Sequence, residues 1–183
     1  MAPPPPIAGY AFPLVFYTAA VAVNHLVLGS VTSDAGSVVL PSPALWRIFM
    51  HFFIIAVTLL IHKSAHTVYH RLASQAFRNK EDYVASGVTP PSQLEENEQV
   101  ERVRRAHLND IEFFVVAFPV ALVFIASSPS ILAAQVWLYG AAALRVLHTV
   151  AYLLALGFRG PCWFFSTVCV VGMLGHSVAH AFL

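Results

Sequence analysis

The chain has 183 residues, of which 58% are hydrophobic and only 10% are charged, whereas soluble domains carry about 25% charged residues. Ten lysine and arginine residues against nine acidic ones leave a formal net charge of +1, too small for the basic surface that binding to nucleic acid requires. The composition therefore excludes a soluble domain and a nucleic-acid partner, and it predicts an all-α integral membrane protein in contact with the lipid bilayer.

Residues 1–43 are predicted to form an N-terminal region of their own. Four consecutive prolines at 3–6 are incompatible with a helix, and residues 9–29 then form an apolar run of the length that one membrane span needs. We expect this run to be a retained extra hydrophobic helix, because it lacks the basic flank of a secretory signal peptide, with cleavage as the alternative. A loop rich in Ser, Gly and Pro completes the region.

Residues 44–183 are predicted to form the main membrane domain, a four-helix transmembrane bundle. The expected helices are 44–77, about 93–127, 131–156 and 162–183, with a loop at 78–93. Ser92 is expected to cap the second of them, with Glu95, Glu96 and Glu98 in its first turns. The turn at 127–130 is so short that the helices on its two sides must be antiparallel neighbours.

The cations of the chain gather around the loop at 78–93. They are Lys63, Arg71, Arg78, Lys80, Arg102, Arg104 and Arg105, with Arg159 on the same side. Only Arg47 is expected at the opposite face of the membrane. Because cytosolic loops carry an excess of Lys and Arg, we expect the loop at 78–93 to face the cytosol.

The segment ERVRRAHLNDIE at 101–112 brings charge into the second predicted span of the domain. At about 100° per residue, one face of this helix contains Glu101, Arg105, Leu108, Asn109 and Glu112. Asp110 points the other way. A membrane helix carries such a polar face only against protein or a water-filled cavity, so the segment marks a functional site.

The helix predicted at 131–156 supplies a second polar stripe, with Arg145, His148 and Tyr152 spaced i, i+3 and i+7. We expect Arg145 to form an ion pair with Glu112, because each charge would otherwise be unpaired below the membrane surface. Loss of one member of such a pair costs about 3 to 5 kcal/mol. We interpret this pair as structural.

Together, the segment at 101–112 and RVLHTVAY at 145–152 closely resemble the MAPEG family (membrane-associated proteins in eicosanoid and glutathione metabolism). The resemblance extends from Arg47 onward, and the helix at 9–29 has no counterpart in the four-helix plan of this family. It implies a homotrimer that binds glutathione as co-substrate between neighbouring subunits, at the cytosolic face. It also implies the endoplasmic reticulum, with the mitochondrial outer membrane as the alternative.

The resemblance implies glutathione-binding positions on three helices. They are Arg71, Arg104, Arg105, His107, Asn109, Glu112, His148 and Tyr152. Arg104 and His107 leave the main polar face, so they would reach the ligand only through a neighbouring helix or subunit.

The resemblance also implies a catalytic arginine, for which Arg159 is the candidate. The family arginine lies nine residues after the matching tyrosine, where this chain has Pro161, so the match requires a two-residue deletion. One charge-assisted hydrogen bond, of about 1.5 to 3 kcal/mol, supplies most of the ~2.7 kcal/mol needed to ionise a thiol at neutral pH. The alternative interpretation of Arg159 is an anchor at the membrane surface.

The expected activity is that of a membrane-bound glutathione transferase acting on apolar electrophiles, with glutathione peroxidase activity towards lipid hydroperoxides left open. The alternatives are a glutathione-dependent eicosanoid (prostaglandin E) synthase and a non-catalytic glutathione-binding protein. Leu108 stands where the synthase branch carries arginine, which favours the transferase. Tyr83 replaces a cysteine of the transferase branch, so we expect no activation through modification of that thiol.

Several histidines share a helical stripe, namely His51, His62, His66 and His70. No cysteine or carboxylate accompanies them to complete a coordination shell, so we expect no metal site.

Overall fold

The computed structural model describes residues 41–91 and 97–182, and these residues form helices and connecting turns. Within them, the helical segments long and apolar enough to cross a membrane are Pro43–Ser74 (α2), Glu98–Ala126 (α4), Ile131–Leu153 and Arg159–Phe182 (α7). The expected all-α membrane fold with four spans is therefore confirmed. The expected helix at 9–29 and the expected cap at Ser92 lie outside the described residues.

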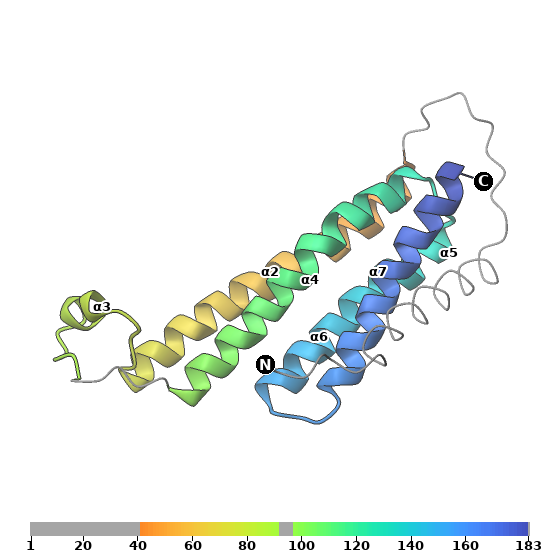
Figure 1. The fold of residues 1–183 in the computed structure, drawn as a ribbon. Helices are drawn as coiled ribbons and strands as arrows, with labels where there is room; N and C mark the ends of the chain where they lie inside the picture. The colour runs from red at the N-terminus through yellow and green to blue at the C-terminus, as the bar shows by residue number, and fades with distance from the viewer. Residues whose placement is uncertain (1–40, 92–96, 183) are drawn as a thin grey trace, which may run out of the picture.

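The four spans are arranged as two helix pairs (Figure 1). α2 packs along α4, and α7 packs along α6 (Gly140–Leu153). The turn between α6 and α7 lies at the same end of the bundle as the connection from α2 to α4, and the α2–α4 pair reaches further at that end. This topology brings the charged start of α4 and the start of α7 to the same end of the molecule.

Local capping explains where α2 and α4 begin. The side chain of Ser42 accepts a hydrogen bond from the backbone N–H of Leu45, and proline follows Ser42 at the first helical position. The side-chain oxygen of Asn97 accepts from the N–H groups of Gln99 and Val100, at 3.0 and 3.2 Å. α4 therefore begins at Glu98, and its cap is Asn97, at a later position than the predicted one.

Three other elements differ from the sequence prediction. The predicted loop at 78–93 contains a short helix, Lys80–Ala85 (α3). The span at 131–153 is not uniform, because a π-helical turn, Gln135–Tyr139 (η1), separates α6 from the short helix Ile131–Ala134 (α5). α7 begins at Arg159, which is its first helical residue and not part of the preceding turn.

The π-helical turn packs very closely against α7. The ring of Trp137 lies over Gly172, where a Cβ atom would meet ring carbons at 2.9 Å. Only glycine permits this approach. The contact depends on residues far apart in the chain, which explains why the apolar pattern of the segment predicted a continuous α-helix.

Aromatic and small residues form the core of the bundle, with members from all four spans. Phe52 of α2 contacts Phe114 of α4 edge to face, with ring centroids 6.1 Å apart, and both side chains are buried. Buried alanines let the helix backbones approach each other; they include Ala56, Ala117, Ala121, Ala141 and Ala142. This core holds the polar end of the bundle in a defined geometry.

Candidate functional site

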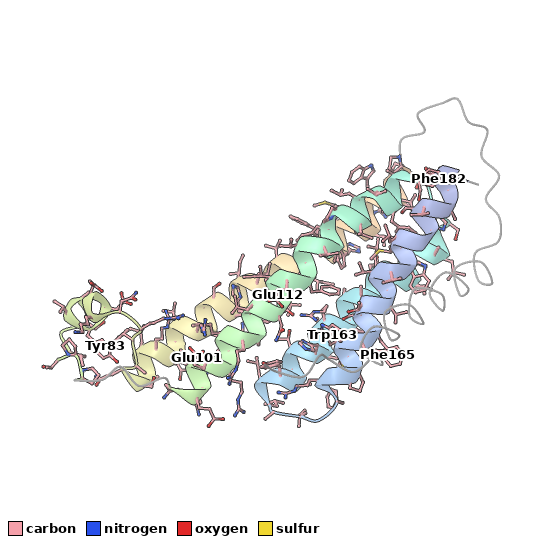
Figure 2. All side chains as sticks on the ribbon, in the orientation of Figure 1. Tyr83, Glu101, Glu112, Trp163, Phe165 and Phe182 are labelled. Atoms are coloured by element: carbon pink, nitrogen blue, oxygen red, sulfur yellow. The ribbon has the colours of Figure 1, made fainter. Side chains whose placement is uncertain are left out.

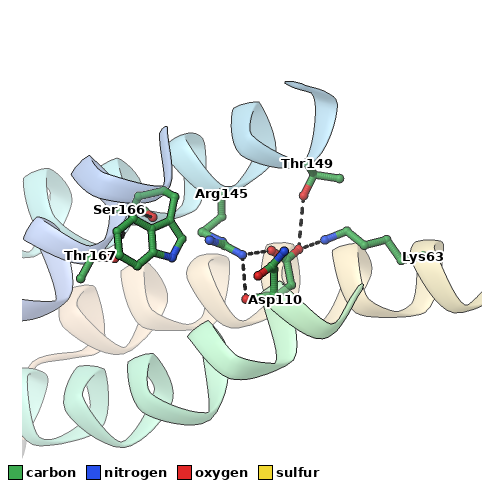
Figure 3. A network of polar contacts seen from close by, with 8 residues as sticks. Lys63, Asp110, Arg145, Thr149, Ser166 and Thr167 are labelled. Carbon is green, nitrogen blue, oxygen red and sulfur yellow. Dashed lines mark hydrogen bonds and ion pairs between the residues drawn. The ribbon is translucent and has the colours of Figure 1, made fainter. Parts of the chain in front are cut away.

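The inner face of α4 carries a carboxylate that ties three helices together. Asp110 forms ion pairs with Lys63 of α2 and Arg145 of α6, and all three side chains are 0% exposed (Figure 3). The hydroxyl of Thr149 on α6 donates a further hydrogen bond to Asp110, at 3.2 Å. Two cations thus share one carboxylate inside the bundle, where unpaired charges would be very costly.

This network corrects two sequence predictions. Arg145 was expected to pair with Glu112, but its carboxylate partner is Asp110, and the side chain of Glu112 is exposed. Residues two apart on a helix point about 200° from each other, so a cation inside the bundle reaches Asp110 and not Glu112. Lys63 was grouped with the cations that flank the loop, whereas it lies in the interior.

Sequence reasoning missed Asp110 as a site residue, although a signal was present. Asp110 lies within a predicted span and points away from the polar face of 101–112. Its carboxylate therefore had to face either lipid or the other helices of the bundle. A buried carboxylate needs a cation, and Lys63 and Arg145 both lie within predicted spans. The sequence alone did not show that both cations reach the same carboxylate.

Arg145 makes two more contacts with α4. Its Nη2 atom donates a hydrogen bond to the backbone carbonyl oxygen of Asn109, at 3.0 Å. The central carbon of its guanidinium group lies 4.5 Å from the centroid of the Phe113 ring. Arg145 therefore holds α4 through a side chain, a backbone carbonyl and an aromatic ring.

The outer face of α4 borders a cavity of about 260 Å³ between α4 and α7. Its lining consists of Asn109, Glu112, Phe113, Val116, Trp163, Thr167 and Val170. Glu112 and Trp163 lie where α4 and α7 face each other (Figure 2). The wall from α4 supplies an amide and a carboxylate, and the remaining lining is mostly apolar. Such a cavity suits a ligand with a polar part and an apolar part.

Three more predicted site residues come together where α6 ends and α7 begins. The rings of His148 and Tyr152 lie 5.7 Å apart, and His148 is buried. The guanidinium carbon of Arg159 lies 5.1 Å from the centroid of the Tyr152 ring, a cation–π contact. Trp163, one helical turn after Arg159, lines the cavity, so this corner is next to it.

The remaining predicted site residues are Arg71, Arg104, Arg105 and His107. None of them lines the cavity, and in the described part of the chain the ring and cation–π contacts that join His148, Tyr152 and Arg159 do not include them. Arg104 donates to both carboxylate oxygens of Glu101, at 2.7 to 3.0 Å. Arg105 is exposed, and His107 is half-buried. Arg71 is half-buried in the last turn of α2, and its Nε atom has no hydrogen-bond partner among the described residues.

Three histidines of α2 interact with one another, whereas the Nδ1 atom of His51 lies 2.9 Å from the hydroxyl oxygen of Tyr139. The Nε2 atoms of His66 and His70 lie 3.0 Å apart, and the rings of His62 and His66 are 5.5 Å apart. Within residues 41–91 and 97–182, no group of three or more His, Cys, Asp or Glu side chains is arranged to hold a metal ion. Tyr83 is buried and packs edge to face on Phe77, with ring centroids 5.1 Å apart.

Comparison with known proteins gives independent information on the family of this chain. Residues 49–179 match the model of the MAPEG family. The chain is 34% identical to microsomal glutathione S-transferase 1 of Rattus norvegicus over 107 residues, which cover 57% of this chain and 69% of that protein. The human protein of that name shows the same identity and coverage, and the mouse protein is 33% identical over the same length.

Proposed function

Because the chain belongs to the MAPEG family, we propose that it is a membrane-bound glutathione transferase that conjugates glutathione to hydrophobic electrophiles. One observation carries the proposal: Asn109, Glu112 and Trp163 line one cavity, and Arg159 precedes Trp163 by one turn of α7. This arrangement combines polar groups for a peptide, an apolar wall for an electrophile and a neighbouring cation for a thiolate.

The charges at this end of the bundle suit glutathione, a tripeptide with two carboxylates, one ammonium group and a thiol. Arginines bind carboxylates in a bidentate manner, and Arg71 and Arg105 are assigned this role. Glu112 would pair with the ammonium group, and Asn109 would hydrogen-bond to the peptide. The two buried cations, Lys63 and Arg145, outnumber the single carboxylate between them, so they add positive potential behind the cavity.

In the proposed reaction, the thiol of glutathione releases its proton to water, and Arg159 holds the sulfur as a thiolate. The thiolate attacks a carbon atom of the electrophile, a C–S bond forms and the leaving group departs with its electron pair. Tyr152 fixes the guanidinium group of Arg159 through their cation–π contact. His148, Arg104 and His107 complete the proposed binding set, and Arg104 and His107 would reach the ligand only through a neighbouring helix or subunit.

A homotrimer is part of the proposal. Arg105 and Glu112 are exposed on α4, which is a predicted membrane span, and charged side chains in a membrane face protein or water. A neighbouring subunit would cover this face and would bring its own Arg71 towards the ligand. We assign the activity to residues 44–183, with the site facing the cytosol because the cations cluster at this end. The endoplasmic reticulum is proposed as the location because of the similarity to microsomal glutathione S-transferase 1.

The test uses the protein purified in detergent and follows conjugation of glutathione to 1-chloro-2,4-dinitrobenzene. We expect Arg159→Ala to lower kcat by about 100-fold, the usual effect of removing one group that stabilises the reacting anion. Arg47→Ala is the matched control, because Arg47 is an exposed arginine near the other end of α2. Full activity in Arg159→Ala would remove Arg159 from its role.

The other candidate activities can be tested with the same purified protein. Glutathione binding without conjugation would identify a non-catalytic glutathione-binding protein. Isomerisation of a prostaglandin endoperoxide would identify a synthase, and reduction of a lipid hydroperoxide would add peroxidase activity. Absence of any glutathione binding would contradict the proposed function as a whole.

A further inference from the structure

Arg145 contacts the wall of the cavity from behind. Besides its ion pair with Asp110, Arg145 contacts Asn109, through the backbone carbonyl oxygen, and Phe113, through the ring. Both residues line the cavity between α4 and α7. Arg145 itself is 0% exposed and does not line the cavity. A buried side chain therefore supports the same two residues that a ligand would meet.

The contacts of Arg145 are spread along one stretch of α4. Asn109 and Phe113 are four residues apart, so they lie one above the other on the same side of the helix. The hydrogen bond to the Asn109 carbonyl and the ring contact with Phe113 restrict the rotation of α4 about its axis and its sliding along α6. The ion pair with Asp110 restricts the same two motions from the adjacent side.

The same arginine belongs to the helix that carries the other half of the site. His148 and Tyr152 follow Arg145 at i+3 and i+7 on α6, and Tyr152 contacts Arg159 of α7. The contacts of Arg145 therefore join the α4 group, with Asn109 and Glu112, to the α6–α7 group. Lys63 and Thr149 also contact Asp110, but in the described part of the chain no hydrogen bond, ion pair or cation–π contact joins either of them to the cavity wall.

The geometry points to Arg145 as a positioning residue that sets where the cavity wall of α4 stands relative to His148, Tyr152 and Arg159. The kinetic consequence rests on the proposed function, in which the α4 group binds the peptide part of glutathione and the α6–α7 group holds its thiolate. A misplacement of about 1 Å between such groups can lower a rate by about 100-fold.

An arginine is required for this role, and a lysine does not replace it. The guanidinium group is planar, so its Nη2 atom can donate to both Asp110 and the Asn109 carbonyl oxygen while its central carbon lies over the Phe113 ring. The ammonium group of a lysine keeps the charge for Asp110 but has no plane to lie on the ring. Arg145→Lys therefore separates the positioning role from the ion pair.

The first measurement compares Arg145→Lys with Thr149→Val in the conjugation assay. Thr149→Val is the matched control, because it removes a hydrogen bond to the same carboxylate and leaves the cavity wall untouched. We expect Arg145→Lys to lower kcat by about 10- to 100-fold with a much smaller change in the KM for glutathione, and Thr149→Val to leave both constants unchanged. Equal kinetic effects in the two variants would show a purely structural role and overturn the inference.

The second measurement needs no enzymatic activity. The chain has three tryptophans, Trp46, Trp137 and Trp163, so labelling with 5-fluorotryptophan gives one ¹⁹F NMR resonance for each, and Trp163→Phe assigns the resonance of Trp163. Trp163 faces Asn109 and Phe113 across the cavity, whereas Trp46 lies near the start of α2. We expect Arg145→Lys to shift the Trp163 resonance and not that of Trp46.

The NMR comparison keeps the two proposals separate. If the unmodified protein does not conjugate glutathione, the proposed function fails, and a Trp163 shift in Arg145→Lys but not in Thr149→Val still supports the positioning role. An unshifted Trp163 resonance in Arg145→Lys overturns it. If Arg145→Lys does not fold, Arg145→Gln answers the same question, because Lys63 still pairs with Asp110 while the contacts of the guanidinium group with Asn109 and Phe113 are lost.

Discussion

The inner and outer faces of α4 carry similar residue types but stand in opposite environments. On the inner face, Asp110 is 0% exposed and has partners on α2 and α6 of the same chain. On the outer face, Glu112 is exposed and borders a cavity shared with α7. The two carboxylates are only two residues apart, so about half a helical turn separates a residue that organises the fold from one that is available to a ligand.

The comparison shows how one polar segment serves two purposes. The inner carboxylate is surrounded by more positive than negative charge, since Lys63 and Arg145 both pair with it. The outer groups remain to be paired by glutathione or by a neighbouring subunit, as we propose. Substitutions on the inner face should therefore change stability first, and substitutions on the outer face should change ligand binding first.

The largest effect is expected for Asp110→Asn, which leaves two buried cations without a carboxylate. Removal of one partner from a buried ion pair costs about 3 to 5 kcal/mol, so we expect a marked fall in the unfolding temperature in detergent. Cys162 and Cys169 are free and buried, so a thiol-reactive fluorescent dye reports unfolding directly. Glu112→Gln is the control and should unfold at the temperature of the natural protein.

A smaller effect, on binding only, is expected for Glu112→Gln. Loss of a charge-assisted hydrogen bond to the ammonium group of glutathione costs about 1.5 to 3 kcal/mol, which raises the Kd about 10- to 150-fold. Isothermal titration calorimetry in detergent measures this change. Glu98→Gln serves as the control, because Glu98 is exposed and pairs with Arg102 on the same helix. A loss of stability with unchanged affinity would reverse our assignment of the two faces.

The contact between Tyr152 and Arg159 should contribute less. Replacing the ring by an aliphatic side chain removes a cation–π interaction of about 0.5 to 1 kcal/mol. We expect kcat/KM for conjugation to be about 2- to 5-fold lower in Tyr152→Leu than in Tyr152→Phe, which keeps the ring. If both variants show the same kcat/KM, the ring does not hold Arg159 in place.

The smallest effect is expected at the exposed start of α4, where Arg102 and Glu98 form an ion pair at 2.6 Å. Exposed pairs with i, i+4 spacing contribute about 0.3 to 0.5 kcal/mol, since water screens them. A double-mutant cycle of Arg102→Ala and Glu98→Ala, read by thermal unfolding, should give a coupling energy of this size. A coupling energy as large as the cost of about 3 to 5 kcal/mol expected for Asp110→Asn would show that exposure does not distinguish the start of α4 from its inner face.

Much of the fold follows from sequence patterns that act locally. Apolar runs of about 20 residues locate the spans, and residues 127–130 and 154–158 separate them, so α4 ends and α7 begins within a few residues of the predicted positions. α3 and the π-helical turn did not follow from such patterns. The π-helical turn carries Trp137, which packs over Gly172, a residue distant in sequence.

The candidate site was predictable to a similar extent. The spacing within 101–112 placed Asn109 and Glu112 on one face, and both residues line the same cavity. The same spacing could not choose the partner of Arg145, because helical periodicity states the direction of a side chain but not which helix lies there. The choice of Asp110 depended on how α2, α4 and α6 surround that position.

By itself, the sequence determined the membrane environment, the four spans of the described region and the polar side chains of α4, because hydropathy and helical periodicity are local properties. The tertiary structure alone decided that Lys63 and Arg145 share Asp110, that Arg145 reaches the backbone of Asn109, and that Trp163 stands across the cavity from Glu112. These contacts join residues from different helices. Their formation depends on the packing of the whole bundle, in which each buried charge must find a partner.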